Sequence, residues 1–151
     1  MPRKIEMENN ERYWIVAASK DHVKRGVIGG FMQANHGKLP PLKRLKSNDW
    51  VIFYSSKQSM GGEEKCQAFT AIGQVKVGEP YQFEFSEDFK PFRRNINFMN
   101  CNEVSILPLI PELQFIENKK SWGYPFRFGF FEIKKADFEL INKEMLRKDA
   151  G

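Results

Sequence analysis

The sequence predicts an α+β protein that is mainly β: a small, curved mixed β-barrel of about six strands with peripheral helices. Three observations predict this class. The apolar segments are short and rich in aromatic residues, which favour strands, and the chain holds fourteen phenylalanines. Strand-like segments follow one another without the regular alternation with long helices that marks a parallel βαβ protein. The length of 151 residues is enough for one domain with a substantial core.

The first third of the chain predicts one strand and one helix after a polar start. Residues 1–12 are polar and are expected to form a flexible N-terminus, leaving 13–151 as the domain. Tyr13 to Ala18 is an apolar run of aromatic and β-branched residues, typical of a buried strand. Ser19 can cap a helix that begins at Lys20 and is ended by the glycines at 26, 29 and 30. The following LPPL, residues 39–42, predicts an extended break in regular structure.

The rest of the chain predicts further strands and a closing helix. A polar, glycine-containing loop at 57–65 separates two strand-like segments, which indicates an antiparallel hairpin. Pro108 and Pro111 indicate an irregular stretch or a short helix. Apolar residues at helical spacing predict a helix over 136–146. The remaining strand patterns fall at residues 49–54, 66–77, 81–85, 94–98 and 127–133.

Positive charge is concentrated in one segment. Residues 19–46 hold seven Lys or Arg and one Asp, a net charge of +6, whereas the whole chain has a net charge of +5. This segment also holds both histidines and the Gly29-Gly30 pair. Localised positive charge beside glycines and aromatic residues is what a site for an anion or a nucleic acid requires.

Several other classes of protein are disfavoured. No run approaches the roughly 18 apolar residues of a membrane span, and the N-terminus lacks the apolar region of a signal peptide. A cytoplasmic protein without a membrane partner is therefore expected. Cys66 and Cys101 are far apart and match no metal-ligand spacing, so two reduced, partly buried thiols are favoured over a disulfide, and no metal or cofactor is expected.

The sequence offers no convincing catalytic set. GVIGGF, residues 26–31, matches neither the dinucleotide-binding nor the P-loop glycine pattern. Ser19, Asp21 and His22 are close in sequence, but residues on one helical turn diverge and rarely form a triad. No catalytic residue is therefore expected, and an enzyme using His22 or His36 as a base remains a weaker alternative.

Two aromatic and basic clusters are better candidates for binding. Trp122 lies in KKSWGYPFR, a polar loop rather than an apolar run, where an indole can stack on a planar ligand. The KPFRR segment at 90–94 places paired arginines beside an aromatic ring, a pattern suited to binding a phosphate or stacking on a base.

Several segments in order resemble the bacterial EVE-domain proteins: YWIVAASKDHVKRGVIGGFMQANHGK, KRLKSNDWVIFYS, QAFTAIGQV, FKPFRRNINF and WGYPFRFGFFEI. The resemblance covers nearly all of residues 13–146. It implies a PUA-like fold related to the YTH and ASCH domains, and recognition of modified bases in nucleic acid by an aromatic-lined pocket. The positions that match the family's pocket are Ser19, Lys20, Gly30, Phe31, His36, Gly37, Lys38, Tyr54, Ser55, Trp122 and Gly123.

These residue types can be given roles in holding a base. Trp122, Phe31 and Tyr54 could form a flat slot, and Ser19, Ser55 and His36 could contact the edge of the base. The cations expected to hold the nucleic-acid backbone outside the slot are Lys20, Lys38, Lys43, Arg44, Lys46, Arg93 and Arg94.

The sequence therefore predicts a non-catalytic nucleic-acid-binding module that recognises a modified, for example methylated, base. The main alternative is a small-molecule protein that binds a nucleotide, a nucleobase or an acidic metabolite. The choice between RNA and DNA, and the oligomeric state, stay open at this point.

Overall fold

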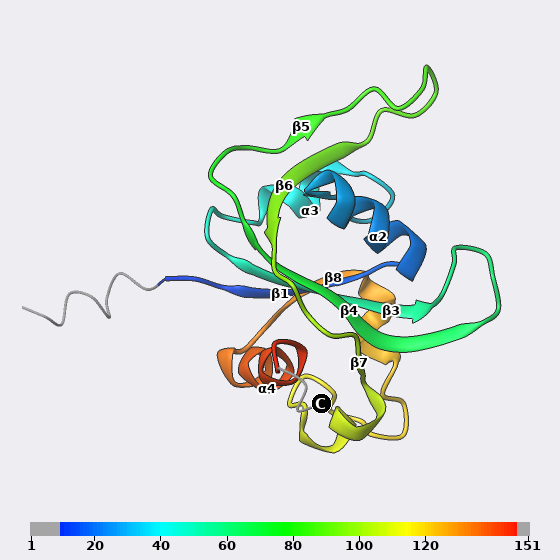
Figure 1. The fold of residues 1–151 in the computed structure, drawn as a ribbon, viewed down its shortest axis with the longest axis vertical. Coiled ribbons are helices and arrows are strands. Elements are labelled where there is room, and N and C mark those ends of the chain that lie inside the picture. The colour runs from blue at the N-terminus through cyan, green and yellow to red at the C-terminus, as the bar shows by residue number, and fades with distance from the viewer. Residues whose placement is uncertain (1–9, 148–151) are drawn as a thin grey trace, which may run out of the picture.

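A strongly curved mixed β-sheet with helices on both of its faces makes up the protein (Figure 1). The computed structural model describes residues 10–147. The path of the sheet is β2-β6-β4-β3-β1-β8, with β5 paired to β6 and β7 paired to β4. The strands are β1 Tyr13–Ala17, β2 Phe31–Met32, β3 Trp50–Lys57, β4 Lys65–Val75, β5 Tyr81–Gln82, β6 Phe92–Phe98, β7 Val104–Ser105 and β8 Phe130–Ile133.

The three α-helices follow β1, β2 and β8, and they cover the two faces of the sheet. The α-helices are α2 Lys20–Gly29, α3 Leu39–Lys43 and α4 Lys135–Met145, and the 3-10 helices are η1 Leu107–Glu112 and η2 Tyr124–Phe128. In Figure 1, α2 and α3 lie on one side of the central strands, and α4 lies on the other. This mixed, mainly β architecture with peripheral helices confirms the predicted fold class.

Strand β1 is the next-to-last strand of the sheet path and contacts both hydrophobic cores. It pairs in parallel with β3, Ile15 facing Ile52, and antiparallel with β8 on its other side. Because side chains alternate along a strand, Tyr13 and Ile15 enter the core beneath α4, whereas Trp14 and Val16 enter the core beneath α2 and α3. A strand buried on both faces is apolar at every position, which explains the unbroken YWIVA run.

The curl of the sheet brings its two outer edges together near the end of β1. The segment after β2 reaches Gly129, the residue before β8, and a Cβ at Gly129 would lie 2.5 Å from the side-chain oxygen of Asn35. Gly129 also has a left-handed φ of 74°, and its carbonyl accepts a hydrogen bond from the Ala17 amide at 2.9 Å. Glycine thus allows the sheet to close at this point.

Several predicted elements differ from the structure. The LPPL segment forms the short helix α3 instead of an extended break, because both prolines fall in its first turn, where no N–H is needed. The expected strand at 81–85 is limited to Tyr81–Gln82, and the expected strand at 127–133 begins only at Phe130, after η2. The two-residue strands β2 and β7 carry too little periodicity to be recognised in sequence.

The N-terminal residues and the two cysteines can be compared with the predictions made for them. Of the expected flexible N-terminus, residues 1–9 lie outside the described part of the chain. Arg12 is anchored, because its amide donates to Asp49 Oδ1 at 3.1 Å and its carbonyl accepts from the Trp50 amide. Cys66 and Cys101 are free, partly buried thiols, as predicted.

Candidate ligand-binding site

A pocket of about 230 Å³ opens where β1 and β3 end. Its walls are residues 17–19, the end of β3 with the loop as far as Gly61, and Phe126 of η2. Tyr54 is only 2% exposed, and its ring stacks on that of Phe126 with centroids 3.9 Å apart. The volume lies below the roughly 300–1,000 Å³ of sites for drug-sized ligands, so the pocket suits one small planar group.

Polar groups surround the aromatic wall of this pocket. Ser19 donates from Oγ to Asp21 Oδ1 at 2.5 Å, and this hydrogen bond lowers the pKa of Asp21. Ser56, Lys57 and Ser59 belong to the opposite wall and are exposed. Burial raises the pKa of the Tyr54 phenol, which therefore stays protonated at neutral pH. The pocket thus combines ring surface, hydroxyl groups and one ammonium group.

A strained loop lies between the residue before β8 and the base of the β5–β6 hairpin. Asn35, His36 and Gly37 are consecutive residues in left-handed conformation, with φ of 47°, 64° and 82°. For the two non-glycine residues this conformation costs of the order of 1–3 kcal/mol each, and such strain concentrates at functional sites. Asn35 contacts Gly129, which is hydrogen-bonded to Ala17 of the pocket wall. The loop therefore lies beside the pocket without lining it.

Arg93 forms a second aromatic arrangement on the α2 side of the molecule. Its guanidinium lies 3.8 Å from the ring centre of Phe31 and 3.7 Å from that of Phe83. Its Nε donates to Gln33 Oε1 at 2.9 Å. Among residues 10–147, no carboxylate forms an ion pair with Arg93. Two phenyl rings and one amide thus hold this cation, without a neutralising partner.

The structure does not gather the predicted binding residues into one slot. Ser19 and Tyr54 line the pocket, as a pair. Trp122 packs at the edge of the core beneath α4, and Gly123 follows it at the start of η2. Phe31 packs instead on Gly29 of α2, on the other face of the sheet. The proposed slot of Trp122, Phe31 and Tyr54 is therefore wrong, because the sheet separates Phe31 from the other two and Trp122 does not line the pocket.

The remaining members of the predicted set lie on the α2 side. Gly30 is the left-handed residue that ends α2, with φ of 77°. His36 and Lys38 are exposed in the segment before α3, and Gly37 is buried against Pro91. These residues are near the Phe31–Arg93 arrangement and outside the pocket wall.

Two predicted contact residues are occupied within the fold. Ser55 is 0% exposed and shares a hydrogen bond of 2.8 Å with Thr70 Oγ1, so it is not available to the edge of a base. Arg94 is 3% exposed, and its guanidinium donates to the carbonyls of Leu45 and Lys76 and to Ser47 Oγ. Arg94 therefore joins segments of the chain and does not face a phosphate.

Lys20 is the cation beside Ser19, and it is paired. Its Nζ lies 2.6 Å from Glu103 Oε1, and this hydrogen-bonded contact raises the pKa of Lys20. Cys66 Sγ lies 3.8 Å from the other oxygen of Glu103, and burial raises the pKa of that thiol. Lys20 can reach a ligand phosphate only by exchanging the carboxylate for it.

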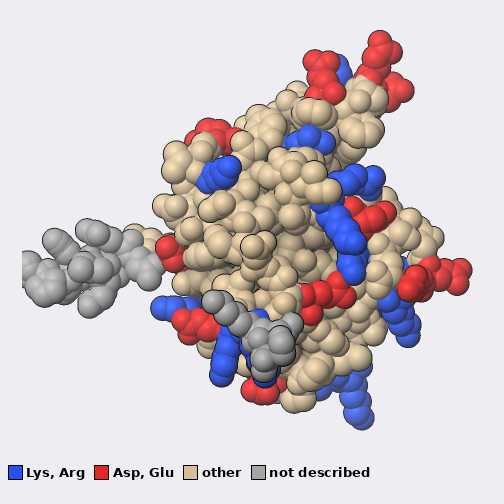
Figure 2. All heavy atoms as spheres, in the orientation of Figure 1, with Lys and Arg blue, Asp and Glu red and all other residues tan. Residues whose placement is uncertain are grey.

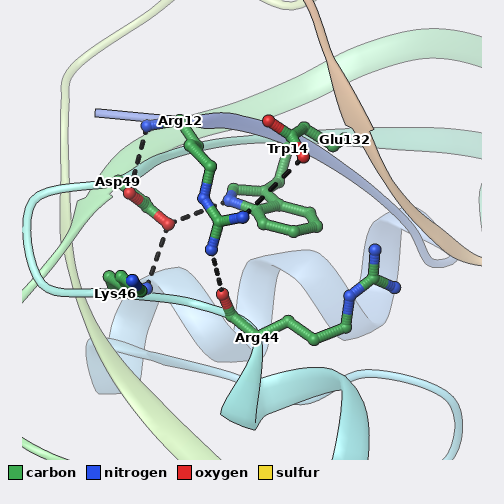
Figure 3. Close-up of polar contacts among 6 residues, drawn as sticks. All are labelled: Arg12, Trp14, Arg44, Lys46, Asp49 and Glu132. Atoms are coloured by element: carbon green, nitrogen blue, oxygen red, sulfur yellow. Dashed lines mark hydrogen bonds and ion pairs between the residues drawn. The ribbon is translucent and has the colours of Figure 1, made fainter. Parts of the chain in front are cut away.

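The expected backbone cations Lys43, Arg44 and Lys46 lie at the far end of β1 from the pocket. Figure 3 shows the network there. Asp49, 2% exposed, accepts hydrogen bonds from Trp14 Nε1 and from the amides of Arg12 and Lys46. The guanidinium of Arg44 lies 4.9 Å from the Trp14 ring centre. Lys43, Arg44 and Lys46 are all exposed, so they form a cationic surface over a closed, fully bonded interior.

Of the residues that line the pocket, sequence reasoning predicted only Ser19 and Tyr54 and missed the others, among them Phe126, Ser56, Lys57, Ser59 and Met60. Phe126 was assigned to no role because residues 124–128 look like part of a loop and strand, and only the 3-10 turn directs its ring onto Tyr54. The polar loop after β3 carried a usable signal, since its serines and glycines follow directly after a buried strand. Within the described residues, no three His, Cys, Asp or Glu side chains cluster as metal ligands.

Two solved structures with nucleic acid bound have a fold similar to that of this chain. The YTH domain of the Zygosaccharomyces rouxii MRB1 protein, solved in complex with N6-methyladenosine RNA, covers 89% of this chain and 86% of its own, with a TM-score of 0.62 and 14% identity. Human THYN1, solved with DNA containing 5-methylcytosine, covers 92% of this chain and 99% of its own, with a TM-score of 0.50 and 11% identity. The fold is thus PUA-like.

The sequence comparisons show to which family of proteins this chain belongs. The EVE domain matches residues 12–144, and the chain belongs to the EVE-domain family. A UPF0310 protein of Mycolicibacterium vanbaalenii is 51% identical over 137 residues, which are 91% of this chain and 94% of the relative. Both findings confirm the resemblance noted in the sequence. No helix among residues 10–147 has the length and apolar character to cross a membrane.

Proposed function

We propose that this protein is a nucleic-acid-binding module that accepts one modified base, for example a methylated one, in the pocket between β1, β3 and η2. The observation that carries the proposal is the stacked Tyr54–Phe126 pair beside exposed hydroxyl groups. Two neighbours in fold were solved with methylated RNA and with methylated DNA. Both kinds of nucleic acid are therefore natural probes.

The pocket has the chemistry that an extruded base requires. A base needs a flat apolar surface for its ring, polar groups for its edge, and cations outside for the phosphates. Phe126 supplies ring surface, Ser56 and Ser59 supply hydroxyls, and Lys57 supplies a cation at the rim. The thioether of Met60, 59% exposed, is a soft apolar group that can adapt to a methyl substituent.

The methyl group itself supports only modest discrimination. One buried methyl carbon contributes about 0.8 kcal/mol, which is roughly a fourfold preference over the plain base. Most of the affinity should therefore come from stacking and from phosphate contacts. The chain's net charge of +5 favours such contacts, and their affinity should fall steeply as salt concentration rises.

Fluorescence anisotropy with short labelled strands tests the proposal. The probes are single-stranded RNA and DNA with one N6-methyladenine or one 5-methylcytosine, beside their unmodified versions. Phe126→Ala should weaken binding by about 1–3 kcal/mol, the worth of stacking one base on one ring. The matched control is Phe128→Ala, because Phe128 lies two residues further along η2, is 60% exposed and does not line the pocket.

Two results would contradict the proposal. One is equal loss of affinity in the Phe126 and Phe128 variants; the other is affinity that stays constant between low and moderate salt. Competition between free nucleosides and the labelled oligonucleotides distinguishes nucleic-acid binding from small-molecule binding in the same pocket. If free nucleosides bind tightly and no oligonucleotide binds, the pocket serves a small ligand instead.

A further inference from the structure

The hairpin connection that joins β5 to β6, residues 83–91, projects from the body (Figure 1), and its aromatic rings are exposed. Phe85 is 67% exposed, and Phe83 and Phe89 are about 40% exposed. The tip is well bonded, since the amides of Phe85 and Ser86 both donate to the carbonyl of Phe89. Clustered exposed aromatic rings on an ordered element mark an interaction surface.

These rings continue into an aromatic stripe that contains Arg93 and ends at α2. Phe83 packs on Arg93, and Arg93 packs on Phe31. The Phe31 ring in turn lies against Gly29, at the end of α2. Ile28, 87% exposed, precedes this glycine. One continuous stripe thus runs from the hairpin tip, through the Phe83–Arg93–Phe31 stack, to the end of α2.

The two ends of the stripe carry opposite charge. The hairpin holds three acidic residues, Glu84, Glu87 and Asp88, and one cation, Lys90, and all four are exposed, so its net charge is negative. At the other end, Lys24 and Arg25 lie four and three residues before Ile28 on α2, and therefore on the same face of the helix. In Figure 2, acidic side chains predominate at the tip of the hairpin, at the top of the view, and basic side chains lie among acidic ones over the body below it.

The charge pattern decides which kind of partner fits. Three carboxylates around Phe85 and Phe89 repel a phosphate backbone and an anionic lipid surface alike. A surface with an acidic end, a middle in which Phe83 and Phe31 stack on Arg93, and a basic end is complementary at its two ends to a copy of itself turned by half a rotation. In that arrangement each tip meets the α2 end of the other copy, as a twofold interface requires. We propose that two copies of this chain associate through this stripe into a symmetric dimer.

Sedimentation equilibrium of the full chain over a wide concentration range tests the dimer. The unmodified protein should dimerise reversibly, and Phe85→Ser should shift it to monomer. The matched control is Phe128→Ser, because Phe128 has similar exposure, 60%, and lies on η2, outside the stripe. Phe85 and Phe128 are both exposed, so neither change should unfold the protein; circular dichroism checks this.

Charge reversal provides a test that a general loss of stability cannot imitate. The double variants Glu87→Lys/Asp88→Lys and Lys24→Glu/Arg25→Glu should each weaken self-association about tenfold or more, because like charges then face each other at both ends. A mixture of the two variants should form a heterodimer, since both contacts between tip and helix are then of opposite sign.

The outcomes separate this proposal from the nucleic-acid proposal. A protein that stays monomeric at every concentration, or a dimer that survives both Phe85→Ser and charge reversal, overturns the dimer. A Phe85→Ser variant that loses binding of the oligonucleotide probes without a change in mass also overturns it and makes the tip a nucleic-acid platform. Neither Phe85 nor any other residue of the stripe lines the β1–β3 pocket, so base binding can fail or succeed independently.

Discussion

The two ends of strand β1 differ in how far their polar groups are already bonded within the protein. At its beginning, the buried carboxylate of Asp49 accepts three N–H groups, from Trp14, Arg12 and Lys46, and two arginines cover the indole (Figure 3). At its end, the pocket holds the Tyr54–Phe126 rings and exposed serines. The Asp49 end, where the polar groups are hydrogen-bonded to one another, stabilises the fold, whereas the pocket end leaves polar groups and ring surface for a ligand. Substitutions near the beginning of β1 should therefore mainly change stability, whereas substitutions near its end should mainly change ligand binding.

The largest expected effect is on stability at the Asp49 end. Asp49→Ala should lower the free energy of unfolding by about 3–5 kcal/mol, because it leaves buried donors without an acceptor. Urea denaturation measures this change. The exposed carboxylate Glu132, 3.9 Å from Arg12, is the control, and Glu132→Ala should change stability by less than about 0.5 kcal/mol. Equal, small effects of both changes would mean that the network does not stabilise the fold.

The pocket end should show the reverse pattern. Ser56→Ala and Ser59→Ala should each weaken binding of a modified-base oligonucleotide by about 0.5–1.5 kcal/mol, the worth of one hydrogen bond. Their urea midpoints should stay close to that of the unmodified protein, because both side chains are exposed. Ser121→Ala, an exposed serine away from the pocket, is the control. A loss of stability without a loss of binding would remove the distinction between the two ends.

A smaller effect should distinguish the cations at the two ends. Lys57→Gln removes the ammonium group at the rim of the pocket and should reduce the slope of log affinity against log salt by about 0.7–0.9. Lys43→Gln, at the far end of β1, should reduce it less if the bound strand stays near the pocket. Binding isotherms at several salt concentrations measure both slopes. A larger change for Lys43 would place the nucleic-acid backbone over the Asp49 end.

The smallest expected effect concerns pH. The Ser19 hydroxyl, and then the amide of His22, hold the pKa of Asp21 below its ordinary value. The ionised carboxylate is thus favoured in the folded state, so its contribution to stability is full above the unfolded pKa of about 3.9 and is lost as pH falls through the lower folded pKa. Ser19→Ala should raise the pKa of Asp21, as NMR titration of its carboxyl carbon can show. An unchanged pKa would mean that Ser19 is available to a ligand instead.

Much of the fold could be predicted because its signals are local. The YWIVA run and the hairpin of β3 and β4 show their periodicity within a few residues, and α4 shows helical spacing. Residues of the site were harder to predict. Arg93 and Arg94 are adjacent and identical in type, yet Arg93 lies between the rings of Phe31 and Phe83 and Arg94 is buried among carbonyls. The difference arises because successive side chains of a strand point to opposite faces of the sheet, and only the tertiary structure shows which face is buried.

The sequence by itself determined the family, the mixed sheet and the positive charge, since all of these depend on residue types and short spacings. Tertiary structure alone decided which aromatic ring meets Tyr54: Phe126 from η2, and neither Trp122 nor Phe31. It also decided that Ser55 and Arg94 are occupied internally. The physical reason is that contacts between segments dozens of residues apart depend on the curl of the sheet, which no local pattern encodes.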